Sequence, residues 1–341
     1  MKRERVVIIG SGPAGMAAAL YTARAQLQPK IIIGPQFGGQ AAITHEIENY
    51  PGFVEPISGP ELAEQMKAQS ERFGAEYVWD AVTDTDFSQR PFKVTTNNET
   101  YLADSVIIGI GADPRKLGVP GEAEYTGFGV SYCGTCDGFF FRGKEVVVVG
   151  GGDSAFEEAI FLTKFATKVT IMYRKGQENL SAGVQLQERV RKNDKIEVLY
   201  HHVVNEIKAG ESGAVSAATV TNTQADETYD FDTDGVFIFI GHIPNSKVFG
   251  DQLSTDAQGY LLTDERHRTN VEGVFAAGEI QDPIWRQVAT SVGQGTAASM
   301  AAIQWLEVHE DELQPLDEDA GISPEEDPVT SEEVTLNPPT Y

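Results

Sequence analysis

The chain has 341 residues and a net charge of −25, from 51 acidic residues against 26 Lys and Arg. Such an acidic surface repels nucleic acid and anionic membranes, so the composition argues against both as partners. No apolar run approaches the roughly 18 residues of a membrane span, and residues 1–5 lead directly into a strand pattern, so we expect a cytoplasmic protein of about two domains.

The first motif is a glycine loop between a predicted strand and a predicted helix. Residues 6–9 are apolar and β-branched, which indicates a buried strand of a parallel sheet. Gly10, Gly12 and Gly15 follow in the spacing G-x-G-x-x-G, and residues 16–25 form an Ala-rich helical pattern. Glycines there permit a tight turn, the approach of a pyrophosphate and close helix–strand packing, so the motif predicts a dinucleotide site.

Turn-rich loops and further strands follow the first motif. The strand at residues 30–33 ends without the acid that would bind ribose hydroxyls, so those contacts must come from elsewhere. Loops around Gln40 and Asn49 carry amide side chains, which can donate and accept as a flavin ring edge requires. Three more elements are predicted before the cysteines: a helix at 59–73, short strands within 77–96 and a buried strand at 105–110.

Cys133 and Cys136 are the only cysteines, and they stand in the spacing C-x-x-C. This spacing suits a redox-active disulfide, a metal clamp or a buried structural pair. A zinc site needs about four ligands, and the six histidines show no ligand spacing, so we predict no metal. The redox interpretation is favoured, and Asp137 lies beside the pair, where it can exchange a proton with a thiolate.

The strand–glycine loop–helix pattern repeats immediately afterwards. A buried strand at 145–149 runs into a G-x-G-x-x-A loop that contains Gly152, Asp153 and Ser154, before a helix at 156–165. A second dinucleotide site follows from the repeat.

The strand predicted at residues 168–173 ends at Arg174 and Lys175 instead of an acid. Cations at this point suit a 2′-phosphate, which favours NADP over NAD. A solvated basic pair at a strand end is the alternative.

A third succession of strand, glycine and helix is predicted near the end of the chain. A strand at 273–277 leads to Gly278 and Glu279, an acid that could bind ribityl or ribose hydroxyls. A helix at 288–306 follows, and its N-terminal N–H groups could face a flavin carbonyl. His242 adjoins a turn, and we expect this histidine to have a structural role. Between the second glycine loop and this region we predict a helix at 183–192, a strand at 196–200, a hairpin at 216–230 and a strand at 235–240.

The last 36 residues hold twelve acidic residues and no Lys or Arg. This composition predicts an extended or disordered tail, ending at Tyr341.

Together these segments resemble the low-molecular-weight thioredoxin reductases over residues 6–306. The C-x-x-C pair lies just before the first strand of the second nucleotide domain, a placement particular to that family. The resemblance implies an α/β fold with two Rossmann-like, three-layer β/β/α domains, the second inserted in the first. The implied division is 1–115 and 245–308 for the FAD-binding domain, 116–244 for the NADP(H)-binding domain with the C-x-x-C, and 309–341 for the tail.

The resemblance also implies roles for the matching residues. Electrons would pass from NADPH through FAD and the pair Cys133 and Cys136 to thioredoxin or a thioredoxin-like protein, with Asp137 as the acid. The enzyme would be a homodimer, and its domains would rotate about hinges near Lys116 and residues 241–245. The implied FAD-binding residues are Gly10, Gly12, Ala14, Gly15, Gly39, Gln40, Asn49, Gly278, Glu279, Arg286, Gln287 and Val288. The implied NADPH-binding residues are Gly152, Asp153, Ser154, Arg174 and Lys175.

The chain departs from the family pattern at the nucleotide phosphate. The family's His-Arg-Arg and following Arg correspond to Tyr173, Arg174, Lys175 and Asn179. A weakened phosphate clamp keeps open a ferredoxin-type donor in place of NADPH. A ferredoxin or flavodoxin–NADP reductase on the same scaffold would lack the cysteine pair, and a nucleotide-sensing binding protein would not need one. The family's Gly-Asp near the end of the FAD domain is Gly278 and Glu279 here.

Overall fold

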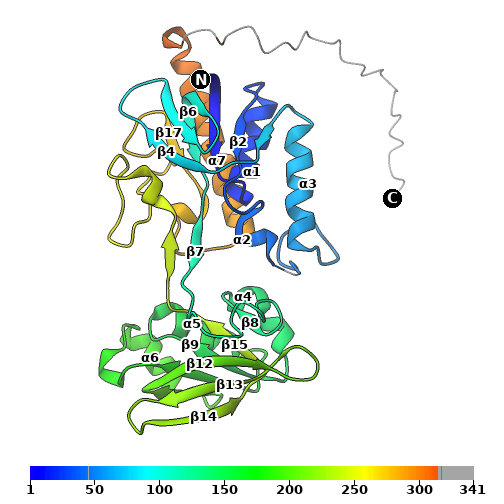
Figure 1. The fold of residues 1–341 in the computed structure, drawn as a ribbon, viewed down its shortest axis with the longest axis vertical. Coiled ribbons are helices and arrows are strands. Elements are labelled where there is room, and N and C mark those ends of the chain that lie inside the picture. Colours follow the sequence, from blue (N-terminus) through cyan, green and yellow to red (C-terminus); the bar gives the residue numbers. More distant parts are fainter. Residues whose placement is uncertain (45, 314–315, 317–341) are drawn as a thin grey trace, which may run out of the picture.

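The computed structural model of the protein describes residues 1–44, 46–313 and 316. The described chain forms two lobes joined by a narrow connection, and both ends of the described chain belong to the first lobe (Figure 1). Tyr341 and most of the predicted acidic tail lie outside the described residues. None of the described helices combines the length and apolarity needed to span a membrane.

The first lobe is built on a seven-stranded sheet. Its centre is parallel because strand β1 (Lys2–Ile9) pairs in the same direction with β2 (Lys30–Ile32) and β6 (Thr100–Ile108). The order is β3-β2-β1-β6-β5-β4, with β17 paired to β6. The other strands are β3 (Glu76–Val78), β4 (Val82–Asp86), β5 (Phe92–Thr96) and β17 (Val274–Ala276).

Helices cover one face of this sheet. Helices α1 (Pro13–Arg24) and α7 (Val288–Val308) run side by side against it, and their small residues allow a close approach. At Gly295 a Cβ atom would lie 2.1 Å from the Ala14 carbonyl oxygen, so only glycine fits there. Helix α3 (Gly59–Glu71) packs beside α1, and short α2 (Gly39–Ala42) packs against α3. On the other face, apolar side chains of the β4–β5 hairpin and of the segment after residue 245 complete the core.

The second lobe has three layers. Its five-stranded sheet is parallel, in the order β11-β10-β9-β15-β8. Helices α5 (Asp153–Leu162) and α6 (Val184–Arg191) lie on one face, and an antiparallel three-stranded sheet lies on the other. This is the predicted β/β/α arrangement. The strands are β8 (Val130–Ser131), β9 (Glu145–Val149), β10 (Lys168–Tyr173), β11 (Ile196–Tyr200), β12 (His202–Ala209), β13 (Val215–Asn222), β14 (Glu227–Asp232) and β15 (Gly235–Ile238).

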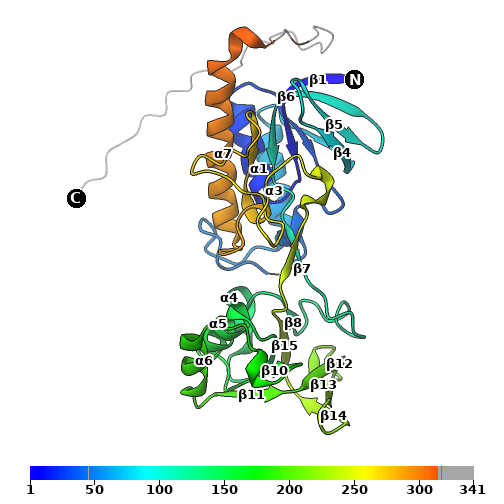
Figure 2. The ribbon, with the colours of Figure 1, turned by 90° about the vertical axis from the view of Figure 1, so that its left-hand side faces the viewer.

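Two short strands carry the chain between the lobes. Strands β7 (Ala112–Pro114) and β16 (His242–Pro244) pair antiparallel, as Figure 2 shows at the waist of the molecule. The Arg115 N–H extends the pair by donating to the Gly241 carbonyl at 2.9 Å. The short helices are α4 (Gly134–Asp137), η1 (Gly138–Phe141), η2 (Gln177–Asn179), η3 (Ser246–Phe249), η4 (Gly278–Ile280) and η5 (Glu310–Glu312).

The predicted strands and long helices are confirmed, with ends shifted by a few residues, but strands β7, β8, β12 and β16 are missing from the sequence prediction. The register of β12 against β13 shifts between Val204 and Glu206. A β-bulge of this kind interrupts the alternation of side chains from which a strand is recognised. The prediction therefore found a hairpin where the structure has three strands.

Candidate active site

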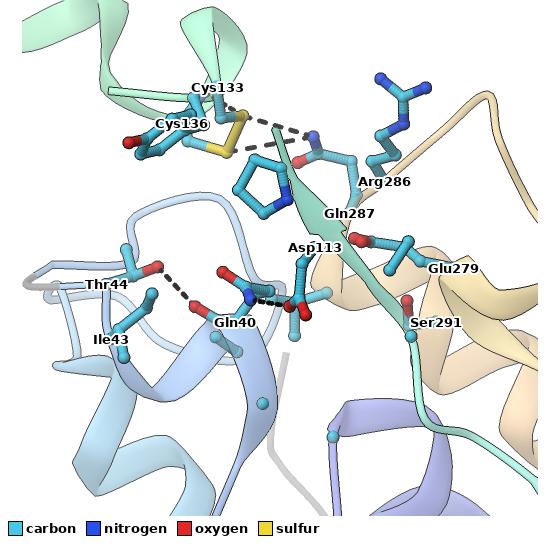
Figure 3. Close-up of a pocket in the computed structure, with 18 of the residues that line it drawn as sticks. Gln40, Ile43, Thr44, Asp113, Cys133, Cys136, Glu279, Arg286, Gln287 and Ser291 are labelled. Carbon is cyan, nitrogen blue, oxygen red and sulfur yellow. Dashed lines mark hydrogen bonds between the residues drawn. A yellow bond between two sulfur atoms is a disulfide. The ribbon is translucent and has the colours of Figure 1, made fainter. Parts of the chain in front are cut away.

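A cavity of about 1230 Å³ lies at the junction of the two lobes. The first glycine loop, loop residues up to Asn49 and the segment around Glu279 line it from the first lobe. Residues of the second lobe, among them the cysteine pair, line it from the other side (Figure 3). Pockets for drug-sized ligands usually measure about 300–1,000 Å³, so this cavity suits an extended ligand such as a dinucleotide.

The first glycine loop opens directly into this cavity. Gly10 has a φ of +102°, and a Cβ there would lie 2.5 Å from the Gly109 carbonyl oxygen. Gly15 lies behind the loop, where a Cβ would approach the Gly10 carbonyl oxygen to 1.9 Å, and it does not line the cavity. At Gly12, by contrast, the nearest atom to an added Cβ is 3.8 Å away, so its backbone faces open space at the start of α1. Helix N-termini with exposed glycine backbone bind pyrophosphate groups, and this loop has the shape for one.

Amide side chains form the opposite wall. Gln40 Nε2 donates to Asp113 Oδ1 at 2.7 Å, and Asn49 Nδ2 donates to Gln287 Oε1 at 3.1 Å. Gln40 and Asn49 line the cavity, together with Ala14 and Gly39.

Glu279 and Arg286, which belong to the segment before α7, also line the cavity. Burial raises the pKa of Glu279 to about 7, and the Arg286 guanidinium opposes this rise. The carboxyl is partly exposed and lines the cavity, where it can hydrogen-bond ligand hydroxyls. Gly278, Gln287 and Val288 line the cavity beside these two residues.

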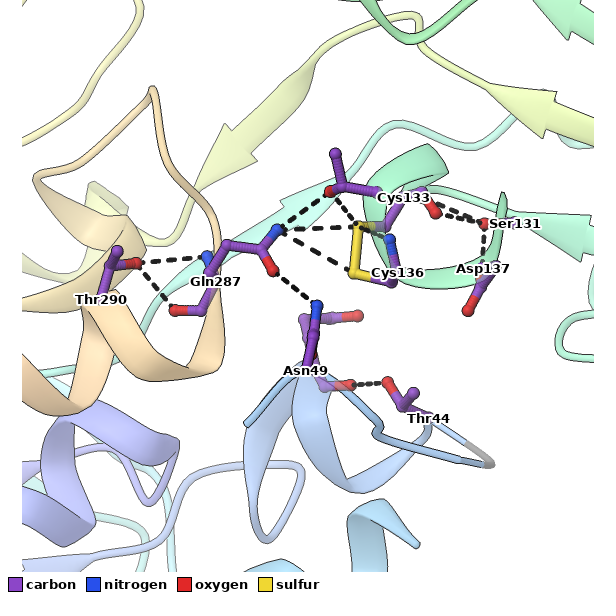
Figure 4. Close-up of a disulfide and its surroundings, with 10 residues drawn as sticks. Thr44, Asn49, Ser131, Cys133, Cys136, Asp137, Gln287 and Thr290 are labelled. Atoms are coloured by element: carbon purple, nitrogen blue, oxygen red, sulfur yellow. Dashed lines mark hydrogen bonds between the residues drawn. A yellow bond between two sulfur atoms is a disulfide. The ribbon is translucent and has the colours of Figure 1, made fainter. Parts of the chain in front are cut away.

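Residues 131–137 of the second lobe, called the redox loop below, carry a disulfide between Cys133 and Cys136, whose Cα atoms are 5.3 Å apart (Figure 4). Ser131 connects this disulfide to Asp137: the Cys133 N–H donates to Ser131 Oγ at 3.0 Å, and Ser131 Oγ donates to Asp137 Oδ2 at 2.6 Å. Burial raises the pKa of Asp137, and the Ser131 hydrogen bond lowers it by a smaller amount. A carboxyl whose pKa is raised holds its proton closer to neutral pH, as a general acid must.

The second glycine loop lies between β9 and α5, away from most of the cavity. Ser154 lines the cavity edge, whereas Gly152 and Asp153 do not. The Asp153 carboxylate accepts a hydrogen bond from the Gly183 N–H at 2.7 Å. Arg174 also lies outside the cavity wall, and so does Lys175; both side chains are exposed where β10 ends.

Tyr173 shapes the second glycine loop. Its ring lies so close to Gly151 that an added Cβ there would be 2.3 Å from a ring carbon. Its hydroxyl donates to the Asn179 carbonyl oxygen at 2.6 Å. The tyrosine therefore ties the glycine loop to the segment that follows the two basic residues.

Four site residues are not evident from the sequence. Ser131 and Asp113 lie within a few residues of a predicted motif or strand end, where a search for polar side chains would have found them. His242, for which the sequence predicted only a structural role, lines the cavity, and burial lowers its pKa to about 4. Glu158 of α5 lies against the redox loop at Gly134, and no spacing signals this contact, because it depends on how two helices pack. Within the described ranges no group of His, Cys, Asp and Glu is arranged to hold a metal ion.

Comparison with known proteins gives consistent matches along most of the chain. The family model for pyridine nucleotide-disulphide oxidoreductases matches residues 4–295. A thioredoxin reductase of Rickettsia bellii is 50% identical over 305 residues, which cover 89% of this chain and 98% of the relative.

Two solved structures show the same similarity. The thioredoxin reductase of Streptococcus pyogenes has 44% identity and a TM-score of 0.85, and the match covers 90% of this chain and 99% of that one. The thioredoxin reductase of Lactococcus lactis in its FR conformation has 41% identity and a TM-score of 0.61, covering 89% and 99%. The chain therefore belongs to the pyridine nucleotide-disulphide oxidoreductase family and, within it, to the low-molecular-weight thioredoxin reductases.

Proposed function

We propose that this protein is a thioredoxin-disulfide reductase, which passes electrons from NADPH through FAD and the pair Cys133 and Cys136 to thioredoxin or a thioredoxin-like protein. The observation that carries the proposal is the position of the disulfide. It lies at the wall of the same cavity into which the first glycine loop opens. A structural disulfide has no reason to face a dinucleotide cavity, whereas a redox pair must.

The cavity residues fit FAD. Gly12 leaves its backbone open at the start of α1 for a pyrophosphate, and Glu279 offers a carboxyl on the cavity wall to ligand hydroxyls. Gln40 and Asn49 would contact the ring edge through their amides. A bound flavin would supply two-electron exchange between a nicotinamide and the disulfide. The other residues proposed to hold it are Gly10, Ala14, Gly39, Gly278, Arg286, Gln287 and Val288. Gly15, which does not line the cavity, would act indirectly by letting helix α1 pack closely behind the glycine loop.

The proposed NADPH site is the second glycine loop, with Gly152, Asp153 and Ser154. Arg174 and Lys175 are exposed where β10 ends, the place at which a 2′-phosphate is expected. The competing donor is a ferredoxin-type protein, which is favoured by Asn179 in place of an arginine.

Asp137 and Ser131 handle the proton of the dithiol step. Reduction of the disulfide produces thiolates, and the raised pKa of Asp137 lets its protonated carboxyl give a proton to one of them. The remaining thiolate attacks the disulfide of the partner protein, and the second cysteine resolves the mixed disulfide. Cys133 and Cys136 are thus the proposed catalytic cysteines, with Asp137 as the acid.

A rotation between the lobes belongs to the proposal, because the disulfide and a nicotinamide would need the same face of the flavin. Two relatives of similar identity, 44% and 41%, differ in TM-score, 0.85 against 0.61, and a different lobe arrangement in the FR conformation would account for that. The hinges would be near Lys116 and residues 241–245, close to β7 and β16. The domain division of 1–115 with 245–308, and 116–244, remains a prediction. A homodimer and a cytoplasmic location are proposed on the family resemblance and on the cysteine usage.

An anaerobic titration of the purified protein tests this function. NADPH, NADH and a chemical reductant are added in separate runs while the flavin absorbance is followed. Stoichiometric bleaching by NADPH, followed by NADPH-dependent reduction of thioredoxin, supports the proposal. If the chemical reductant bleaches the flavin but NADPH and NADH do not, and reduced ferredoxin bleaches it in place of NADPH, the ferredoxin-type donor is favoured.

A further inference from the structure

One side chain of the first lobe reaches the disulfide of the second. Gln287 stands immediately before α7, and its Nε2 lies 3.2 Å from Thr135 Oγ1, 3.8 Å from Cys133 Sγ and 4.0 Å from Cys136 Sγ (Figure 4). The two sulfurs are the atoms that react in the proposed function. The contact is therefore made to the bond that is reduced.

The Gln287 amide is held in this orientation from both sides. Asn49 Nδ2 donates to Gln287 Oε1 at 3.1 Å, which turns the NH₂ group toward the sulfurs. Thr290 Oγ1 accepts from the Gln287 N–H at 3.3 Å and donates to the Gln287 carbonyl at 2.9 Å, which holds the backbone where α7 begins. An amide NH₂ group can only donate, so the disulfide faces donors.

We propose that Gln287 is a catalytic residue whose amide N–H groups stabilise the thiolate formed when the Cys133–Cys136 bond is reduced, with Asn49 as its positioning residue. This inference rests on the proposed function. A bound reduced flavin would supply the two electrons that break the S–S bond, and the two sulfurs would become thiolates. Asp137 gives a proton to one, and the other keeps its charge beside Gln287. The contact strengthens during the step, because donors bind a charged sulfur more strongly than a neutral one.

The position of Gln287 also couples thiolate reactivity to the lobe arrangement. Gln287 belongs to the first lobe and the cysteines belong to the second, so the donors reach the sulfurs only while the disulfide faces the cavity. When the second lobe turns away, the thiolate loses these donors and its pKa rises. The thiolate that remains is then intrinsically more nucleophilic, while a smaller fraction of the thiol is ionised.

Alkylation of the reduced full-length enzyme by iodoacetamide tests the inference, because its rate against pH reports the pKa of the more reactive thiol. We expect Gln287→Leu to raise that pKa by about half a unit, a roughly threefold lower ionisation constant. Gln287→Glu, which places a carboxylate beside the sulfurs, should raise it further, and Asn49→Ala less. Gln304→Leu, an exposed glutamine of the same helix, is the matched control and should change nothing.

Superimposable pH profiles for wild type, Gln287→Leu and Gln287→Glu would overturn the inference. Gln287→Asn shortens the side chain and keeps the amide; if Gln287→Leu does not fold, Gln287→Asn and Asn49→Ala decide the outcome by the same pKa rise or its absence. Failure of the proposed function is seen separately. If the wild-type enzyme does not reduce thioredoxin with NADPH, the proposed function is wrong. A raised thiol pKa in the variants would still show that Gln287 donates to the thiolate.

Discussion

Restoring a positive charge at residue 179 should raise the affinity for NADPH and leave the affinity for NADH unchanged. Asn179 follows the two basic residues, and its carbonyl oxygen is held by the Tyr173 hydroxyl at 2.6 Å. The backbone at this position is therefore tied to the glycine loop, which the Tyr173 ring contacts at Gly151. An arginine at residue 179 would stand near Arg174 and Lys175, where a 2′-phosphate is expected.

The size of the effect follows from one added charge-assisted contact. A hydrogen bond to a charged group contributes about 1.5–3 kcal/mol, and about 1.4 kcal/mol corresponds to a tenfold change in affinity. Residue 179 is exposed, so screening by water and salt favours the lower end of this range. We expect Asn179→Arg to lower the Kd for NADPH about tenfold, with a smaller gain at high ionic strength.

Rapid-mixing measurements of flavin bleaching, with NADPH and NADH in parallel, give the two affinities. Gln224→Arg is the matched control, because it adds the same charge to an exposed turn between β13 and β14 of the same lobe. An equal gain for NADH, or an equal gain in Gln224→Arg, would show that net charge and not a phosphate contact is responsible. An unchanged NADPH affinity would refute the assignment of the phosphate site to residues 174–179.

Four further outcomes are expected. Cys136→Ser should abolish thioredoxin reduction while the flavin is still reduced by its donor; surviving disulfide reductase activity would contradict the catalytic pair. Ser131→Ala removes the hydrogen bond that lowers the pKa of Asp137, so the step that needs protonated Asp137 should persist to higher pH, and an unshifted pH–rate profile would argue against Asp137 as the acid. Burial raises the pKa of Glu158 from its usual value of 4.5 to about 7. The folded state therefore binds this proton more tightly than the unfolded state, and stability is lost as the pH rises from about 4.5 to 7. Glu158→Gln should remove that loss. Its free energy of unfolding, measured by urea denaturation, should gain up to about 3 kcal/mol relative to wild type as the pH rises from about 4.5 to 8. A difference that stays constant across this range would refute the prediction. Glu279→Ala should release FAD at least about tenfold more readily on dialysis, followed by absorbance, whereas full retention would exclude a contact of this carboxyl with the cofactor.

Much of the fold was accessible from sequence because its signals are local. Apolar β-branched runs, glycine loops and Ala-rich helices repeat in the same order in both halves, and each reports on residues adjacent in the chain. The same is true of Cys133 and Cys136, whose spacing alone permits the disulfide. Strand β12 escaped prediction because a bulge near Glu206 breaks its local alternation.

The tertiary structure decided which side chains meet across the site. Gln287 and Asn49 are 238 residues apart in the chain, and Gln287 and Cys133 are 154 apart, yet they form one group at the disulfide. Periodic patterns in the sequence cannot predict such contacts, because the contacts depend on how the sheets, helices and the two linking strands place the lobes. The sequence by itself determined two glycine loops, a redox pair and an adjacent acid. Only the folded chain decided that the disulfide faces the first glycine loop's cavity, that Glu158 lies against the redox loop, and that an amide from the opposite lobe points at the sulfurs, since packing at long range sets all three.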